Sequence, residues 1–179
     1  MFKPVARHLL APALLVLLCS APAQSQAQSA AQSAAPSATQ SNGADIYSAA
    51  ELAVRSAALQ AKAMIAPNGQ AGGKLDTYPP NDFTMLTYRS QNGVVEQHAN
   101  YDDVFVVLDG DATIVTGGTG QNMHPTGKGE QQGTSIVGGK TTKLGKGDII
   151  HISINVPHQL FIEKGHHFTY YVVKIKQVD

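Results

Sequence analysis

The feature that most constrains the fold is a series of short apolar runs that recurs from residue 75 to the C-terminus. The runs are FTMLTY (83–88), VFVVL (104–108), ATIV (112–115), IIHISI (149–154), HQLFI (158–162) and FTYYVVKI (168–175). They are rich in β-branched and aromatic residues, and turn signals such as Asp109-Gly110 and Lys164-Gly165 separate them. Many short strands joined by turns are typical of a β-sandwich or a β-barrel. The sequence therefore predicts one all-β domain over residues 75–179.

The longest connection between these runs, from Gly117 to Gly139, has an unusual composition. It contains eight glycines and few side chains that a core can bury. Connections of this length are usually mobile or functional. We therefore predict a mobile loop at one end of the barrel.

A different pattern precedes the strands, over residues 44–66. Ala, Leu, Gln and Lys dominate it, and Ser48 and Glu51 have the spacing of a capping box. Leu52 and Leu59 lie two turns apart on one face, and Pro67 ends the pattern. The sequence predicts an N-terminal helix whose thin apolar stripe packs against the outside of the barrel or against a partner chain.

Residues 1–23 have the pattern of a secretory signal peptide. Lys3 and Arg7 precede a short apolar stretch, and Ala21-Pro22-Ala23 is a cleavage site with small residues at its ends. The apolar stretch is too short for a permanent membrane span. We expect a mature chain that begins at Gln24 and is periplasmic or secreted.

Two alternatives to this cleavage remain, a lipoprotein and a persistent N-terminal anchor. The lipoprotein would carry its lipid on Cys19, although Leu18 stands where a small residue is typical. Cleavage after Ala23 removes Cys19, which is the only cysteine. The mature domain then depends on its core alone, without disulfides.

Composition describes the segment after the leader and narrows the range of partners. Residues 24–43 are almost entirely Ala, Gln and Ser, which predicts a disordered linker because they offer no large apolar side chain to bury.

The net charge of the chain is close to zero. The chain has 13 basic and 13 acidic residues, and loss of Lys3 and Arg7 leaves 11 basic against 13 acidic, a net charge of −2. We expect no nucleic acid or anionic membrane surface as partner.

Four side chains that commonly bind metals lie beside two of the apolar runs. Glu96, His98 and Asp103 precede one run, and His158 begins another. Imidazole and carboxylate ligands together suit manganese, iron or zinc. We predict that Glu96, His98, Asp103 and His158 bind one divalent metal ion inside the barrel.

The spacing of these residues resembles the first motif of the cupin superfamily. Asp103 stands where the family has a glutamate, with six residues between it and Gly110. His98 then matches the second histidine of the motif, and Glu96 takes the place of the first. In the alternative register His98 is the first histidine and Asn100 the second, so either Glu96 or Asn100 completes the set.

The second cupin motif is matched by Gly147 and His158, which keep its spacing. Ser153, Asn155 and Ile162 replace the proline, glycine and asparagine of the motif. Asn155 is a mild replacement because asparagine adopts left-handed backbone conformations more readily than most residues. The resulting set of two histidines and two carboxylates differs from the family's usual three histidines and one glutamate.

The resemblance implies a fold and a set of functions. The fold is the cupin double-stranded β-helix, a jelly-roll barrel, here with an N-terminal helix. The function implied is that of a metal-dependent oxidoreductase, lyase or isomerase for a small polar or acidic organic molecule, with Glu96 or His151 as proton carrier. A non-catalytic small-molecule-binding module is the alternative, and a structural part of the cell surface is a third reading. A homodimer is also implied, because cupins often dimerise.

Overall fold

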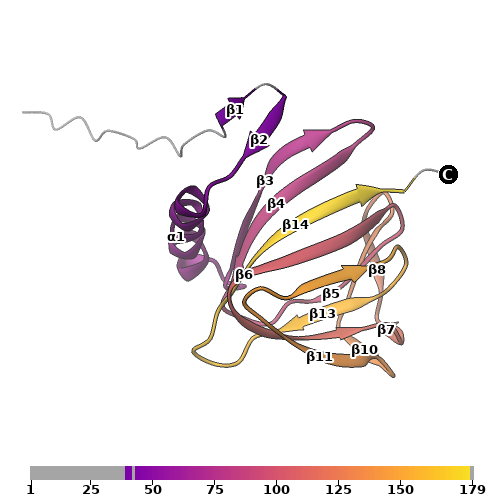
Figure 1. The fold of residues 1–179 in the computed structure, drawn as a ribbon. Coiled ribbons are helices and arrows are strands. Elements are labelled where there is room, and N and C mark those ends of the chain that lie inside the picture. The colour runs from indigo at the N-terminus through magenta and orange to yellow at the C-terminus, as the bar shows by residue number, and fades with distance from the viewer. Residues whose placement is uncertain (1–38, 42, 178–179) are drawn as a thin grey trace, which may run out of the picture. The chain divides into compact units, whose positions relative to one another are not determined.

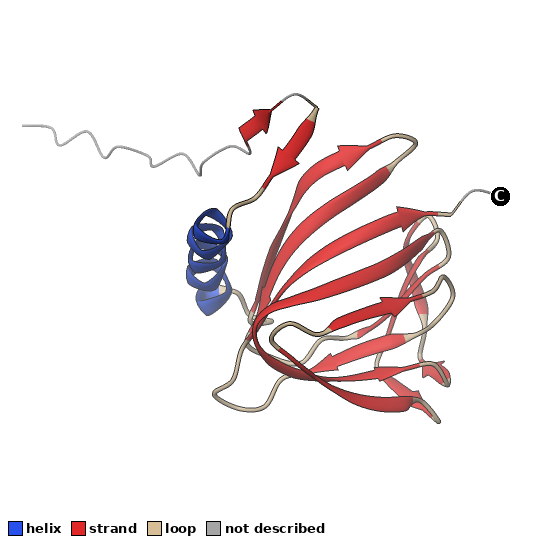
Figure 2. Ribbon diagram, viewed as in Figure 1, coloured by secondary structure: helices blue, strands red, loops and turns tan. Residues whose placement is uncertain are grey.

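The computed structural model describes residues 39–41 and 43–177. The predicted signal peptide, and residues 24–38 and 42 of the predicted linker, lie outside the described residues. In chain order the elements are β1 (Thr39–Ser41), β2 (Ala44–Ile46), α1 (Ala49–Ile65), β3 (Gln70–Tyr78), β4 (Asp82–Arg89), β5 (Val95–His98), β6 (Tyr101–Thr116), β7 (Thr119–Gln121), β8 (His124–Gly127), β9 (Glu130–Gly133), β10 (Ser135–Val137), β11 (Lys140–Gly145), β12 (Ile149–Ile152), β13 (His158–Phe161) and β14 (Phe168–Lys176). Figures 1 and 2 show the strands curling into an open barrel, with α1 against its outside.

The strands from β3 onward are joined mainly in one curled antiparallel sheet. Its order is β3-β4-β14-β6-β13-β5-β9-β8, and β11 and β12 also pair with β6. The prediction of an all-β domain with an N-terminal helix is confirmed. The domain begins earlier than predicted, because β3 starts at Gln70 rather than near residue 75.

The longest strand, β6, belongs to both halves of the barrel. Its first part pairs with β12 and β14, and its second part pairs with β11 and β13. Gly110 lies between the two parts with a φ of 76°, and a Cβ there would collide with the carbonyl oxygen of His167. Only glycine combines this backbone angle with so little space. The predicted turn at Asp109-Gly110 is therefore a bend inside one continuous strand.

Inward-facing side chains of these strands form a single apolar core. In β6 the buried positions alternate, as a strand with one face toward the core requires, whereas in β14 the first three residues are all buried and Val172 follows two positions later. The buried cluster comprises Phe105, Val107, Ala112, Ile114, Leu144, Ile152, Leu160, Ile162, Phe168, Tyr170 and Val172.

The N-terminal helix forms, but it starts later than predicted. Ser48 is its N-cap, and the Ser48 hydroxyl oxygen accepts a hydrogen bond from the backbone N–H of Glu51. A capping residue has extended backbone, so residues 44–46 before it are not helical and pair as β2 with β1. The helix ends at Ile65, because Ala66 precedes Pro67 and is extended. Within the described residues, no helix is long and apolar enough to cross a membrane.

The glycine-rich segment from Gly117 to Gly139, which the sequence predicted to be a mobile loop, contains regular strands. It forms four short strands, β7 to β10. β8 and β9 make a hairpin that extends the sheet beyond β5, and β7 pairs with β10. The glycines supply the left-handed turns between these strands, for example Gly129 with a φ of 77°.

Candidate metal centre

The four residues predicted as metal ligands come from three neighbouring strands. β5 carries Glu96 and His98 two residues apart, so their side chains leave the same face of the strand. Asp103 is near the start of β6, and His158 is the first residue of β13. Because β13 pairs with β5, His158 lies directly opposite Glu96. Sheet register thus brings together residues that are as many as 62 positions apart in the sequence.

One carboxylate oxygen lies against both imidazoles. Asp103 Oδ2 is 3.3 Å from Nε2 of His98 and 3.7 Å from Nε2 of His158. Glu96 Oε2 is 4.0 Å from Nε2 of His158. Donor atoms of Glu96, His98 and His158 all lie within 4.8 Å of one another. The structure therefore brings all four predicted residues to one place.

The other nitrogen of each imidazole is held by a separate oxygen. Nδ1 of His98 contacts the carboxylate of Glu130, its cross-strand partner on β9. Nδ1 of His158 is 3.1 Å from the carbonyl oxygen of Val156. Both oxygens are acceptors, so in the neutral imidazoles the proton lies on Nδ1 and each Nε2 has a free lone pair directed into the site.

Those two Nε2 atoms are buried, and neither makes a hydrogen bond with any described residue. Asp103 Oδ2 approaches Nε2 of His98 to 3.3 Å without hydrogen-bond geometry. Buried polar atoms without partners are uncommon and costly in native proteins. A cation bound between the imidazoles and the carboxylate would satisfy both nitrogens at once.

Burial and charge act in opposite directions on the titrating groups of the site. Burial favours a higher pKa for the Asp103 carboxyl, but His98 and Lys174 outweigh it and hold that pKa below its ordinary value. Burial favours a lower pKa for His98, but the adjacent Asp103 carboxylate raises it above its ordinary value. Burial dominates at His158 and lowers its pKa, which keeps that imidazole neutral.

The geometry fits a divalent ion. Protein ligands at about 2.0–2.2 Å from an ion lie roughly 3–4.3 Å from one another. The distances of 3.3, 3.7 and 4.0 Å between the donor atoms fall in this range. Two imidazoles with carboxylate oxygens are a donor set for manganese, ferrous iron or zinc rather than for calcium.

The two alternative residues at the site lie elsewhere. Asn100 follows the end of β5, and its amide donates to the carbonyl oxygen of Lys128 at 3.4 Å. The geometry thus favours the register in which Glu96, not Asn100, belongs to the set. His151 is not on the pocket wall, because its side chain is 54% exposed and contacts Asp102 on the outside of the site.

The sequence prediction missed three side chains around the centre. Arg89 ends β4 and is buried beside Tyr170, and Lys174 lies near the end of β14 with its Nζ 2.5 Å from Asp103 Oδ1. Glu130 lies in the glycine-rich segment. Arg89 and Lys174 continue the every-second-residue pattern of inward positions in their strands, which was the available signal. No comparable pattern identifies Glu130.

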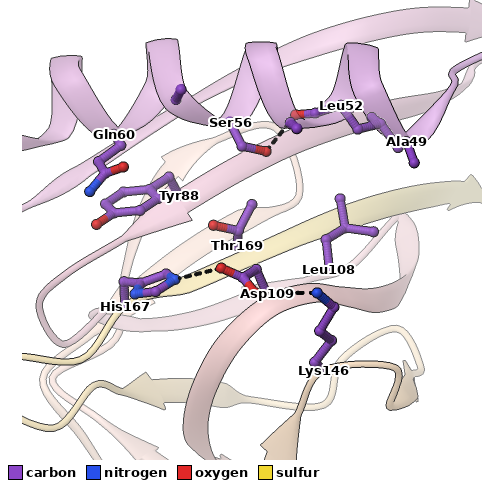
Figure 3. A pocket seen from close by; sticks show the side chains of 12 residues that line it. Ala49, Leu52, Ser56, Gln60, Tyr88, Leu108, Asp109, Lys146, His167 and Thr169 are labelled. Carbon is purple, nitrogen blue, oxygen red and sulfur yellow. Dashed lines mark hydrogen bonds and ion pairs between the residues drawn. The ribbon is translucent and has the colours of Figure 1, made fainter.

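Two cavities are present in the described part of the chain. The smaller one lies inside the barrel beside Arg89 and Lys174, and the larger one lies outside the barrel. The larger cavity has a volume of about 430 Å³ and lies between one face of α1 and the outer face of the sheet (Figure 3). Small side chains of the helix, such as Ala53 and Ala57, leave it open. Its polar end is formed by Asp109, which contacts His167 at 2.9 Å and Lys146 at 3.5 Å. None of the four predicted ligands lines this outer cavity.

No protein-family model and no curated protein matches the sequence. Solved structures do resemble the fold. The polyketide cyclase RemF from Streptomyces resistomycificus is 17% identical, and the match covers 61% of this chain and 68% of that chain, with a TM-score of 0.42. The Cnp3 cupin domain of Schizosaccharomyces pombe is 9% identical, and the match covers 60% of this chain and 65% of that chain, with a TM-score of 0.46. The DMSP lyase DddQ from Ruegeria pomeroyi DSS-3 is 17% identical, and the match covers 62% of this chain and 47% of that chain, with a TM-score of 0.42. These similarities concern the fold alone.

Proposed function

We propose that this chain is a metal-dependent enzyme with one divalent ion bound inside the barrel by Glu96, His98, Asp103 and His158. One observation carries the proposal. The Nε2 atoms of His98 and His158 are buried, have no hydrogen-bond partner among the described residues, and both lie within 3.7 Å of the same Asp103 oxygen. The substrate class is a small polar or acidic organic molecule, because the space beside these residues is small and lined by charged groups.

The donor set favours manganese or ferrous iron, with zinc next, because two carboxylates make the site hard and negative. When bound, the ion supplies Lewis acidity toward an oxygen of the substrate. Glu130 and the Val156 carbonyl fix the orientation of the two imidazoles. Glu96 is also the proton carrier, through the carboxylate oxygen that does not bind the ion, because its side chain is 30% exposed and makes no hydrogen bond within the described part of the chain.

Metal analysis of the purified protein tests this proposal. The mature chain is produced in media supplemented with manganese, iron or zinc and purified without chelators or an affinity metal. We expect about one equivalent of a divalent ion per chain, retained after dialysis. A chain that holds no metal, and takes none up when each ion is added back, would contradict the proposal.

A second candidate function is a metal-free binding module, and a separate observation favours it. Lys174 Nζ lies 2.5 Å from Asp103 Oδ1, so the site already contains a cation paired with its most buried carboxylate. In this case the barrel binds a small molecule without an ion. The same metal analysis separates the two functions, since the binding module holds no metal in any of the three media.

We also propose that the chain is exported to the periplasm or secreted, on the basis of the leader pattern over residues 1–23. Expression of the full chain, followed by N-terminal sequencing of the extracytoplasmic fraction, tests this. We expect a mature chain that begins at Gln24. Recovery of the uncleaved chain in the cytoplasm would contradict the proposal. A homodimer remains a prediction of the resemblance to cupins, and light scattering of the mature protein checks it.

A further inference from the structure

We infer that the barrel holds the carboxylate group of its ligand in a subsite formed by Arg89 and Lys174 beside the metal centre. The inference rests on the proposed function, since it places this subsite next to the ion. It narrows the substrate class from a small polar molecule to a compact organic anion.

The subsite is an inner cavity of about 130 Å³. Strands β4 and β14 contribute side chains at every second position, so that Arg89, Tyr170 and Lys174 all face it. Glu96 and Asp103 border the same cavity. A molecule in this cavity therefore contacts the two cationic side chains and two of the proposed metal ligands together.

The Arg89 guanidinium is the strongest sign of an anionic ligand. Arg89 is only 4% exposed, and arginine is seldom buried unless it is paired. Its Nε donates to the Tyr170 hydroxyl at 3.1 Å, and its terminal nitrogen lies 3.9 Å from Glu96, which is too far for a hydrogen bond. The two terminal nitrogens, an edge that can bind a carboxylate with two parallel hydrogen bonds, lie beside Gly93 and make no hydrogen bond with the described residues.

The balance of charge also favours an anion. In the metal-free site the carboxylates of Glu96 and Asp103 are balanced by Arg89 and Lys174, and the two imidazoles are neutral when they bind metal. A divalent ion adds two positive charges to this buried group. Glu130, the partner of His98, offsets one of them. The metal-bound site therefore has an excess of positive charge, which an anionic ligand neutralises.

The volume limits the size of the anion. At about 30 Å³ per water molecule, 130 Å³ holds roughly four waters. This space suits a carboxylate of about two to four carbon atoms, and the apolar side chains of Phe105 and Val172 on its wall face the carbon skeleton.

Binding of malonate and of its neutral analogue malonamide to the manganese-loaded mature protein tests the inference. Calorimetric titration measures both affinities, and metal content is measured on the same samples. We expect malonate to bind at least tenfold more tightly than malonamide. Equal affinities, or no malonate binding by protein that holds a full equivalent of manganese, would overturn the inference while leaving the proposed metal centre intact.

Variants locate the subsite. We expect Arg89→Gln to weaken malonate binding at least tenfold with manganese content unchanged, and Arg89→Lys to weaken it less, because the charge is kept and the planar fork is lost. Lys146→Met, in the exposed ion pair of the outer cavity, is the matched control and should bind malonate like the parent. Unchanged affinity in folded Arg89→Lys and Arg89→Gln overturns the assignment. Loss of manganese from the parent protein itself contradicts the proposed function instead.

Discussion

Two of the four aspartates of strand β6, Asp103 and Asp109, each form a cluster that contains a histidine and a lysine. On the inner face, Asp103 contacts His98 at 3.3 Å and Lys174 at 2.5 Å. On the outer face, near the larger cavity, Asp109 contacts His167 at 2.9 Å and Lys146 at 3.5 Å. The residue types are identical, but the Asp103 side chain is 2% exposed and that of Asp109 is 58% exposed.

This difference in burial distinguishes the candidate metal centre from an exposed surface ion pair. Water screens the outer cluster and satisfies its remaining donors and acceptors, so its ion pairs contribute little to stability. The inner cluster has no such screening, and a second imidazole, His158, points its free nitrogen at the same carboxylate. The larger cavity lies at the outer cluster, whereas the proposed metal centre borders the smaller one.

The largest expected difference between the two clusters is in metal affinity. We expect His158→Ala to weaken manganese binding at least a thousandfold, because it removes a buried ligand. His167→Ala, the matched histidine of the outer cluster, should change the affinity less than about twofold. Competition against a coloured chelator measures both values, and circular dichroism confirms that each variant is folded. Equal affinities for the two variants would remove the basis for the distinction.

A smaller change is expected at the most exposed ligand. Glu96→Gln keeps an oxygen donor but removes the negative charge of this ligand, so it should weaken manganese binding by about tenfold, less than the loss of His158 does. Asn100→Ala should leave the affinity unchanged, because Asn100 contacts the β8–β9 hairpin instead. If Asn100→Ala has the larger effect, the alternative register of the first motif is the correct one. The same chelator competition provides the measurement.

The inner cluster should also make metal binding depend on pH. The pKa of His98 is raised above its ordinary 6.5, so a proton competes with the ion for Nε2 at pH values where an ordinary histidine is neutral. Affinity is therefore full above the raised pKa and falls by up to about tenfold per pH unit below it. Titrations of manganese between pH 5 and 8.5 measure the onset.

The Glu130→Gln variant sharpens the pH prediction. Glu130 is one of the groups that raise the pKa of His98, so the variant should lose affinity only at a lower pH than the parent. His167→Ala again serves as the control, with an unchanged profile. An identical onset of affinity loss in the parent and in Glu130→Gln would show that Glu130 has no influence on the proton at His98.

The smallest effect is expected from the helix that borders the outer cavity. Ser48→Ala removes the N-cap hydrogen bond to Glu51 and should lower the free energy of unfolding by about 1 kcal/mol. Manganese affinity should not change, because α1 packs against β3 and β4 on the outside of the sheet. Denaturant unfolding and chelator competition on the same variant test both statements. A change in affinity would indicate coupling between the outer and inner regions.

The sequence by itself determined that the domain consists of β-strands preceded by one helix. It also determined that imidazole and carboxylate side chains lie at the candidate site. Short apolar runs predicted β4, β12, β13 and β14, and they predicted β6 as two separate strands. The helix was predicted too, although its start at Ala49 lies later than the predicted bound of residue 44. Asn155, which the cupin motif places where the family has a glycine, has a φ of 60°, as its tolerance for left-handed backbone allows. Glu96, His98, Asp103 and His158 were selected from spacing, and the structure brings them together. These features depend on local backbone preference or on motif spacing, which a sequence displays directly.

The tertiary structure decided which residues surround that site. Arg89 and Lys174 enter it because β4 and β14 pair in register, and Glu130 reaches His98 because β9 pairs with β5. The continuity of β6 through Gly110, and the hairpins inside the glycine-rich segment, likewise depend on partner strands. A strand pattern shows which side chains share a face, but strand pairing is a contact between distant segments. Its register is fixed by burial of whole faces in the folded barrel, which no local stretch of sequence contains.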